Sequence, residues 1–388
     1  MPNINIHIRR ELSSELIRLS DFYSVLVVTG PRQSGKTTLC KVNFPSYHYV
    51  NMEDIALREQ IMLNPKAFLK QFPKGLIIDE VQNVPELLSY IQVVVDEDNS
   101  RKFVLTGSNN FSLMQGITQS LAGRVSVFTL LPLSLQELGD IPYRTDTNTL
   151  IINGGYPAVW AKKIPVQDVS RNYYNTYIER DVRQLMKVKN LSNFQTFMKL
   201  CAGRIGTELN INALSNEIGI SSPTLKEWFS ILEASYIVFR LPPFFKNIGK
   251  RLVKSPKIYF YDTGLACFLL GIETPQQLAV HPLRGVLFEN MVVLEFFKNK
   301  FNKGVLPNYY FYRDKNQKEV DLIEEKANEI KAYEIKSAQL FNKNFIKNLD
   351  YIKNLLGEEV ISTQVIYDGE LTVHSSENGM VNFRNIHF

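Results

Sequence analysis

The chain has 388 residues, which is enough for two or three domains of ordinary size. Hydrophobic residues make up 45% of it and charged residues 21%, as in globular proteins with a sizeable core. No stretch approaches the roughly 20 consecutive apolar residues of a membrane span, and the first residues lack the pattern of a secretion signal. We therefore expect a cytoplasmic protein without a membrane partner.

The net charge is 44 − 39 = +5, which is too small by itself to indicate a nucleic-acid partner. Basic residues are concentrated in residues 162–204 (nine against three acidic) and 240–257 (six against none). Such clusters follow phosphate groups in some proteins and are solvated helix faces or contacts with acidic domains in others. Three distant cysteines in apolar or helical segments predict reduced core thiols rather than disulfides or a metal site; they are Cys40, Cys201 and Cys267.

Residues 24–130 alternate short apolar strands with helical segments, which predicts a parallel sheet with helices on both faces. The predicted strands are 25–29, 47–51, 76–79, 103–106 and 125–130. Residues 160–240 are predicted to be mostly helical. From about residue 285 the pattern is one helix, three strands, one helix and a strand. We expect three domains: α/β (1–155), helical (156–260) and a small α/β domain (261–388).

The strongest motif follows the first predicted strand and fits the P-loop pattern G-x-x-x-x-G-K-[ST]. Its glycines let backbone N–H groups surround phosphates, and the start of the following helix adds a positive dipole. Lys36 is expected to reach the terminal phosphates and Thr37 to bind Mg²⁺. The predicted nucleotide-binding residues are Gly30, Pro31, Arg32, Gln33, Ser34, Gly35, Lys36, Thr37 and Thr38.

Acidic residues end the buried strand at 76–79. Ligands of open α/β sheets bind at the carboxyl edge of the strands, so Asp79 is expected to hold the Mg²⁺ shell. Glu80 is then placed to orient and deprotonate the attacking water. If the next strand lies between the P-loop strand and the Asp79 strand, Ser108 or Asn109 would point at the γ-phosphate or the water. An ordinary Gly-Ser-Asn turn is the alternative.

Arg124 precedes the fifth predicted strand. It is a candidate arginine finger, acting in cis or on a neighbouring subunit, or else a plain surface arginine.

Together these residues resemble the AAA-type ATPase family whose members carry a C-terminal domain of unknown function. The matching segments are residues 30–39, 49–54, 78–82, 105–108, 121–124, 154–157, 178–181 and 259–264. The resemblance covers nearly the whole chain and implies ATP rather than GTP, and an AAA-like sheet with the strand order 5-1-4-3-2. Relatives of this kind often form rings, whereas single-chain switches share the same parts, so a homo-oligomer is one of two open expectations.

Two helices joined by a turn at Gly219, and then an apolar strand, are predicted in the middle of the chain. Ser222 would cap the second helix, with Pro223 at its first position. This pattern resembles a winged helix-turn-helix. A DNA-reading helix would present early polar residues such as Lys226, but the neighbouring Glu227 opposes phosphate approach. DNA binding and a structural role as a spacer or lid both stay open.

Two charged strands near the C-terminus form a predicted hairpin with its turn near residues 327–328. In that register Asp321 lies opposite Glu334 and Glu319 opposite Lys336, with all four on one face. The other face is predicted to be apolar and to contain Val320, Leu322, Tyr333 and Ile335.

Two opposed carboxylates destabilise a strand pair unless something, such as a divalent metal, neutralises them. Asp321 and Glu334 are therefore candidate metal ligands, with Glu289 on the predicted helix 285–299 as a third. Lys336 is a candidate catalytic group rather than a ligand. The arrangement resembles the PD-(D/E)xK nuclease core, which implies Mg²⁺-dependent phosphodiester hydrolysis. The alternative is surface charge pairing, in which Lys336 forms ion pairs with Glu319 and Glu334.

The predicted function is an ATP-binding, Mg²⁺-dependent ATPase whose nucleotide cycle moves the winged-helix and C-terminal domains. An ATP-gated, metal-dependent DNA nuclease is one alternative. A slow ATP-dependent switch that binds a protein partner is the other.

Overall fold

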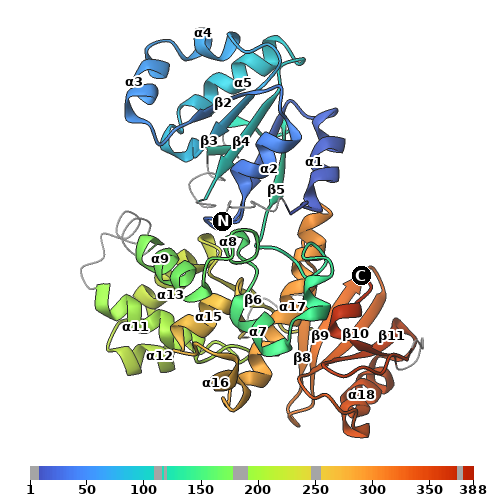
Figure 1. Ribbon diagram of the computed structural model, residues 1–388. Coiled ribbons are helices and arrows are strands. Elements are labelled where there is room, and N and C mark those ends of the chain that lie inside the picture. Colours follow the sequence, from blue (N-terminus) through green and yellow to red (C-terminus); the bar gives the residue numbers. More distant parts are fainter. Residues whose placement is uncertain (1–7, 109–115, 118–119, 178–190, 246–254, 374–378) are drawn as a thin grey trace.

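The computed structural model describes residues 8–108, 116–117, 120–177, 191–245, 255–373 and 379–388. Figure 1 shows an α/β lobe above a larger body, in which a helical part and a second sheet lie side by side. Asn109 and residues 178–181, both named above, lie outside the described residues. Within the described part, no helix has the length and apolar character needed to span a membrane.

The upper lobe is built on a parallel five-stranded sheet in the order β2-β3-β4-β1-β5. This confirms the expected order 5-1-4-3-2, and each strand begins and ends within one residue of its predicted bounds. Every residue of β1, β3 and β4 is buried, as expected for strands between two helical layers. The strands are β1 (Val25–Thr29), β2 (His48–Asn51), β3 (Leu76–Asp79), β4 (Phe103–Gly107) and β5 (Val125–Thr129).

Helices cover both faces of this sheet. One face packs against α1 (Leu12–Ser20) and α2 (Lys36–Asn43). The other packs against α3 (Ile55–Leu63), α4 (Pro65–Lys70) and α5 (Leu87–Glu97). The carboxyl ends of the strands point toward the lower body, so the loops that follow them lie near the junction of lobe and body (Figure 1).

The helical part of the lower body contains the predicted helix-turn-helix pair. Its first helix ends at Gly219, whose φ of 73° is a backbone conformation that glycine adopts easily. The predicted cap of the second helix was wrong by one residue, because the Ser221 hydroxyl accepts the hydrogen bond from the Thr224 N–H and Ser222 is already helical. Pro223 is consequently the second helical residue.

The helices of this part, and the two antiparallel strands packed with them, share one hydrophobic core. They are α7 (Thr147–Asn153), α8 (Pro157–Ala161), α9 (Val166–Thr176), α11 (Leu191–Ala202), α12 (Ile211–Ile218), α13 (Ser222–Ala234), β6 (Val238–Leu241), β7 (Lys257–Phe260), α15 (Thr263–Leu269) and α16 (Pro275–Ala279).

Two of the segments that carry the family resemblance meet in this part. The Asp262 carboxylate caps α15 and accepts a hydrogen bond from the Gly155 N–H at 2.8 Å. A Cβ at Gly154, whose φ is 58°, would lie 2.5 Å from the same carboxylate. The glycines of residues 154–157 therefore let the chain approach the buried Asp262, which is a structural explanation for both segments.

The second sheet is mixed and has the order β12-β11-β10-β9-β8. The predicted succession of helix, three strands, helix and strand is present, and β12 is one strand more than expected. Its elements are α17 (Arg284–Asn302), β8 (Tyr309–Arg313), β9 (Glu319–Lys326), β10 (Glu329–Lys336), α18 (Lys347–Leu356), β11 (Val360–Tyr367) and β12 (Gly379–Asn382).

The β9–β10 hairpin has the predicted register, with Tyr333 opposite Leu322. The predicted apolar face, however, was wrong for Val320. β9 shifts its register against β8 between Tyr310 and Tyr312, so one extra residue of β9 is accommodated there and the side-chain alternation changes. Val320 consequently packs in the core beneath α18, whereas Leu322 packs in the core that contains α17.

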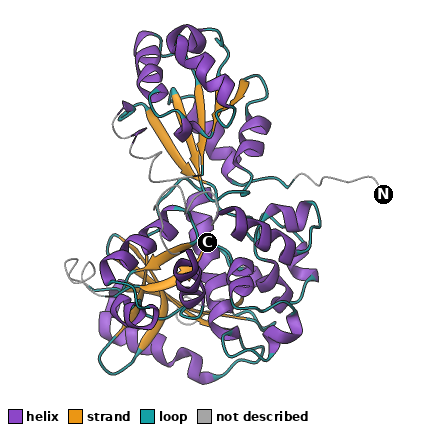
Figure 2. Cartoon of the chain, turned by 90° about the vertical axis from the view of Figure 1, so that its left-hand side faces the viewer, coloured by secondary structure: helices purple, strands orange, loops and turns teal. Residues whose placement is uncertain are grey.

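Helix α17 joins the two halves of the molecule. It runs between the helical part and the second sheet and reaches α1 and β5 of the upper lobe (Figure 1). In Figure 2 the C-terminus lies close to the junction between lobe and body. The edge strand β5 of the upper sheet is thus in contact with the long helix of the lower body.

Candidate functional site

The loop after β1 requires glycine at two positions. A Cβ at Gly30, whose φ is 141°, would lie 2.2 Å from the carbonyl oxygen of Leu130, so no side chain fits there. Gly35 has a φ of 96° and caps α2, which begins at Lys36. The first N–H groups of this helix therefore point into the loop, where they can bind an anion. Residues 30–37 thus have the backbone of a phosphate-binding loop.

Lys36 is buried and donates hydrogen bonds to the carbonyl oxygens of Gly30 (3.0 Å) and Pro31 (2.8 Å). Burial lowers the pKa of Lys36 to about 8, although the nearby carboxylates of Glu80 and Asp79 oppose this shift. A triphosphate in the loop would offer this ammonium group stronger acceptors than the two carbonyl groups.

Asp79, at the end of β3, accepts hydrogen bonds from three hydroxyl groups. Its carboxylate accepts hydrogen bonds from Thr37 at 2.7 Å, from Tyr49 at 2.9 Å and from Thr106. Thr37 and Asp79 together present a hydroxyl and a carboxylate oxygen next to the phosphate-binding loop, and Mg²⁺ prefers such oxygen ligands. These residues therefore fit the predicted metal, and Tyr49 and Thr106 orient the carboxylate.

The sequence argument missed Tyr49, which lies on the edge strand β2. Burial, and then the Asp79 carboxylate, raise the pKa of the Tyr49 hydroxyl, which is therefore protonated and donates the bond. The expected strand order already put this strand beside β3, and the parallel pairing of Asn51 with Asp79 brings its end to this site.

Glu80 and Ser108 meet across two neighbouring strand ends. β4 lies between β1 and β3 as expected, and the Ser108 hydroxyl donates to Glu80 Oε2 at 3.2 Å. Glu80 also accepts a hydrogen bond from Gln82. Its φ of 52° is unusual for a residue with a side chain, and such strained backbone is common at functional sites. The structure thus brings together both side chains that the sequence placed beside the attacking water.

Arg124 lies at the amino ends of the strands, whereas the P-loop lies at their carboxyl ends. β5 runs parallel to β1 with Val125 opposite Val25, so Arg124 is about 20 Å from the level of Gly30, at which the P-loop begins. Its guanidinium group pairs with Asp96 on α5 at 3.0 Å. This placement argues against an arginine finger in cis and leaves an action on a neighbouring subunit and a plain surface arginine as the two alternatives.

Arg10, a buried residue that the sequence argument missed, donates a hydrogen bond to the backbone of the P-loop. Arg10 donates to the carbonyl oxygens of Ser34 (2.7 Å) and Leu131 (2.6 Å), and to the carboxylate of Glu137 (2.9 Å). Glu137 is fully buried and also accepts a hydrogen bond from the Glu11 N–H. The pairing spans 127 residues of sequence, so only the fold reveals it.

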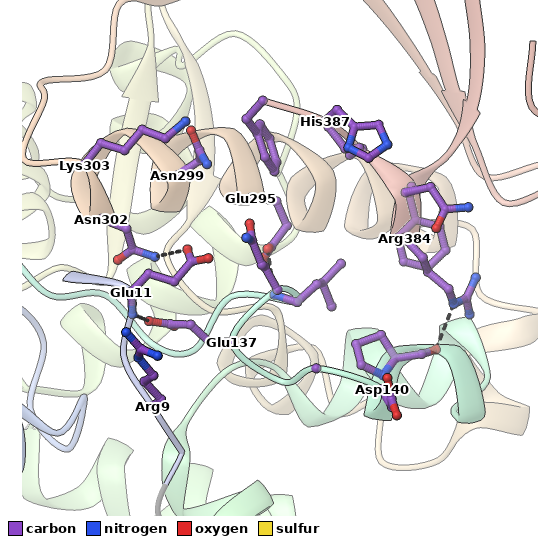
Figure 3. Close-up of a pocket in the computed structure, with 18 of the residues that line it drawn as sticks. Arg9, Glu11, Glu137, Asp140, Glu295, Asn299, Asn302, Lys303, Arg384 and His387 are labelled. Carbon is purple, nitrogen blue, oxygen red and sulfur yellow. Dashed lines mark hydrogen bonds between the residues drawn. The ribbon is translucent and has the colours of Figure 1, made fainter. Parts of the chain in front are cut away.

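Arg9, Glu11 and Glu137 line a cavity of about 1110 Å³ at the junction of lobe and body (Figure 3). Glu11 crosses this junction, because its carboxylate accepts a hydrogen bond from Asn302 of α17 at 3.0 Å. Burial raises the pKa of Glu11. The P-loop is thereby linked to the long helix of the lower body through two adjacent residues, Arg10 and Glu11.

The predicted C-terminal cluster, which consists of Asp321, Glu334, Glu289 and Lys336, is present in part. Asp321 and Glu334 are both buried, and Lys336 lies between them, 3.1 Å from Asp321 and 2.7 Å from Glu334. Burial, and then the Asp321 carboxylate, raise the pKa of Glu334. One oxygen of Glu334 is buried without a hydrogen-bond partner. The ammonium group of Lys336 thus provides the neutralising charge for which a metal was expected.

Glu289 belongs to a separate ion cluster. It contacts Lys257 at 3.4 Å and accepts a hydrogen bond from Tyr259, while Glu319 pairs with Lys257 at 2.5 Å. The predicted pair of Glu319 with Lys336 was therefore wrong, because the buried Lys257 of β7 takes the place of Lys336. Among the residues that the structure describes, no three His, Cys, Asp or Glu side chains are arranged to hold a metal.

Comparison with known protein families assigns the upper lobe. A family model described as an AAA domain matches residues 23–139. Residues 23–139 form an AAA-type P-loop domain. Two further models, both described as domains of unknown function (DUF8612 and DUF4143), match residues 144–276 and 284–386. The AAA domain therefore contains every residue of the candidate nucleotide site except the supporting Arg10.

The relatives found are uncharacterized proteins, and the solved structures found are distant. Uncharacterized proteins of Mycobacterium bovis and Mycobacterium tuberculosis are each 28% identical over 333 residues, covering 84% of this chain and 74% of theirs. A Walker-type ATPase of Pyrococcus abyssi is 14% identical, with a TM-score of 0.47 over 69% of this chain and 98% of that one. Cdc6p of Pyrobaculum aerophilum is 13% identical, with a TM-score of 0.31 over 71% and 97%. These structures are too distant to bear on the function.

Proposed function

We propose that this chain is a Mg²⁺-dependent ATPase. The observation that carries the proposal is the meeting of four side chains at one edge of the AAA sheet. Thr37 of α2 donates to Asp79 at the end of β3, and Ser108 after β4 donates to Glu80. Two oxygen ligands for a metal and one positioned carboxylate base thus lie beside a phosphate-binding loop.

Each side chain has a distinct role in this proposal. Lys36 exchanges its bonds with the Gly30 and Pro31 carbonyl groups for bonds with the terminal phosphates. Thr37 and Asp79 hold Mg²⁺, which supplies charge neutralisation on the phosphates when bound. Glu80 orients the attacking water and accepts its proton, and Ser108 fixes the Glu80 carboxylate.

Equilibrium binding of ATP by the full chain tests this assignment. We expect binding that strengthens with Mg²⁺ and is lost in Lys36→Ala, measured by titration calorimetry. Lys70→Ala is the control, since Lys70 lies on α4 and pairs with Glu97 on the surface of the lobe. Equal ATP affinity in Lys36→Ala and the parent would contradict the proposal.

ATP binding should depend on pH because Lys36 has a lowered pKa. Above about pH 8 the ammonium group loses its proton in the nucleotide-free protein, whereas phosphate binding requires the charged form. We therefore expect the affinity to fall about tenfold between pH 7 and pH 9. Lys36→Arg keeps its charge in this range and should bind with little pH dependence; an equal slope in both proteins would contradict this explanation.

A second candidate function is Mg²⁺-dependent cleavage of DNA by the C-terminal domain. The observation in its favour is the buried Asp321–Glu334 pair with Lys336 beside it and one unpartnered Glu334 oxygen. Cleavage by this site should vanish in Asp321→Ala and persist in Glu80→Gln. Undiminished cleavage in Asp321→Ala would remove the candidate.

The output of the ATPase cycle is proposed to be a movement of the helix-turn-helix pair and the C-terminal domain. The bonds from Arg10 to the P-loop and from Glu11 to α17 support this proposal. Lys226 and Glu227 are exposed on α13, so DNA and a protein remain competing partners for this surface. A protein-binding switch with slow hydrolysis would change its partner affinity or oligomeric state with ATP.

A further inference from the structure

Tyr236, which follows the helix-turn-helix pair, contacts the AAA domain. The Tyr236 hydroxyl lies 2.7 Å from the hydroxyl of Thr29, the last residue of β1 and the residue before Gly30. Thr29 itself donates to the Phe128 carbonyl oxygen at 3.2 Å. Because a hydroxyl group has a single proton, Tyr236 is the donor in its bond with Thr29.

The turn that carries Tyr236 holds the side chain in a fixed direction. Tyr236 follows the end of α13 by two residues and has a φ of 57°, which is rare for an aromatic residue and therefore requires support from its surroundings. Its N–H bonds to the Glu233 carbonyl oxygen at 3.0 Å, and its ring meets Tyr261 edge-on at 5.6 Å. The side chain is 5% exposed. A movement of α13 would consequently move the Tyr236 hydroxyl.

Thr29, at the other end of this contact, directly precedes the loop in which Lys36 would change its hydrogen-bond partners on nucleotide binding. Lys36 holds the Gly30 carbonyl oxygen at 3.0 Å, and it must release this group to reach phosphates. Gly30 has no room to move toward Leu130, because the two backbones are already so close that a Cβ on Gly30 would lie 2.2 Å from the Leu130 carbonyl oxygen. Any adjustment of Gly30 therefore passes to Thr29, and from there to Tyr236.

We propose that Tyr236 is a positioning residue that couples the nucleotide state of the P-loop to the placement of helices α12 and α13. This inference rests on the proposed ATP binding. Because coupling between two sites is reciprocal, loss of the Tyr236 hydroxyl should both weaken the response of α13 to ATP and change the affinity for ATP. Loss of one such hydrogen bond corresponds to about a fivefold change in affinity.

Tryptophan fluorescence can report on α13. The chain has two tryptophans, and Trp228 of α13 is buried against Phe194 and Phe197. In a Trp160→Phe parent, emission comes from Trp228 alone. We expect ATP with Mg²⁺ to change this emission, and Tyr236→Phe to reduce the change several-fold and to shift the ATP affinity about fivefold.

Two further variants separate coupling from general damage. Tyr261→Phe alters the ring partner of Tyr236 without touching the Thr29 contact, and should respond like the parent. Thr29→Val removes the same hydrogen bond from the other side but leaves the bond between Tyr236 and Thr129. It should therefore change the ATP response in the same direction as Tyr236→Phe, and the double variant should show no more loss than Tyr236→Phe alone.

An unchanged ATP response in folded Tyr236→Phe, or no response of Trp228 in a parent that binds ATP, would overturn the proposal. A parent that fails to bind ATP would overturn the proposed function itself.

Discussion

Replacing Glu80 with glutamine is expected to lower ATP turnover about 10²–10⁴-fold while ATP binding persists. The amide keeps the size and the hydrogen bond from Ser108 but cannot accept the proton of the attacking water. Phosphate release by the purified full chain measures turnover, and titration calorimetry measures binding.

Glu86→Gln is the matched control for this prediction. Glu86 lies six residues further along, is exposed and precedes α5, so its replacement should leave turnover unchanged. Turnover in Glu80→Gln within twofold of the parent would mean that another group activates the water.

Replacing Lys257 with alanine is expected to destabilise the lower body by about 3–5 kcal/mol. The side chain is 2% exposed and lies between the carboxylates of Glu289 and Glu319. Its removal leaves the largely buried Glu289 carboxylate without its cation, while Glu319 keeps only Arg313 at 3.5 Å, and this is far more costly than losing an exposed ion pair. The midpoint of thermal unfolding should fall by roughly 10 °C.

Lys300→Ala provides the comparison, because Lys300 pairs with Glu324 at 2.6 Å in a more exposed position. Its cost should stay below about 1 kcal/mol. Combining Lys257→Met with Glu289→Gln should restore part of the lost stability, since charge and counter-charge are then removed together. Equal midpoints for Lys257→Ala and Lys300→Ala would show that the buried cluster contributes no more than a surface pair.

The nucleotide site could be predicted because its residues are local in sequence. The P-loop, Asp79 and Ser108 each follow an apolar strand, and a parallel sheet brings the ends of such strands to one edge. The strand order came from the family resemblance, and without it the meeting of Ser108 with Glu80 would have stayed conditional.

The supporting residues could not be predicted, because their partners are distant in sequence. Arg10 reaches Glu137, and Tyr236 reaches Thr29, through contacts that only the packing of lobe and body creates. A lone arginine before a helix, or a tyrosine before a strand, gives no local signal of such a role.

The C-terminal cluster was predicted in composition and register but not in its pairing. A hairpin turn near residues 327–328 fixes which residues of β9 and β10 face each other, and this was correct as far as Leu322 and Tyr333. The shift of β9 against β8 turns Val320 to the other face of the sheet. Lys257 of β7 pairs with Glu319 in place of Lys336. Neither effect is visible in the hairpin sequence, because both arise from other strands.

ATP turnover by the purified full chain, with Mg²⁺ and with and without duplex DNA, tests the central claim most directly. Lys36→Ala and Asp321→Ala belong beside the parent. We predict phosphate release by the parent and by Asp321→Ala, and none by Lys36→Ala; stimulation by DNA would favour a DNA-directed output over a protein-binding switch. Phosphate release that persists undiminished in Lys36→Ala, or no release by the parent with or without DNA, would contradict the account.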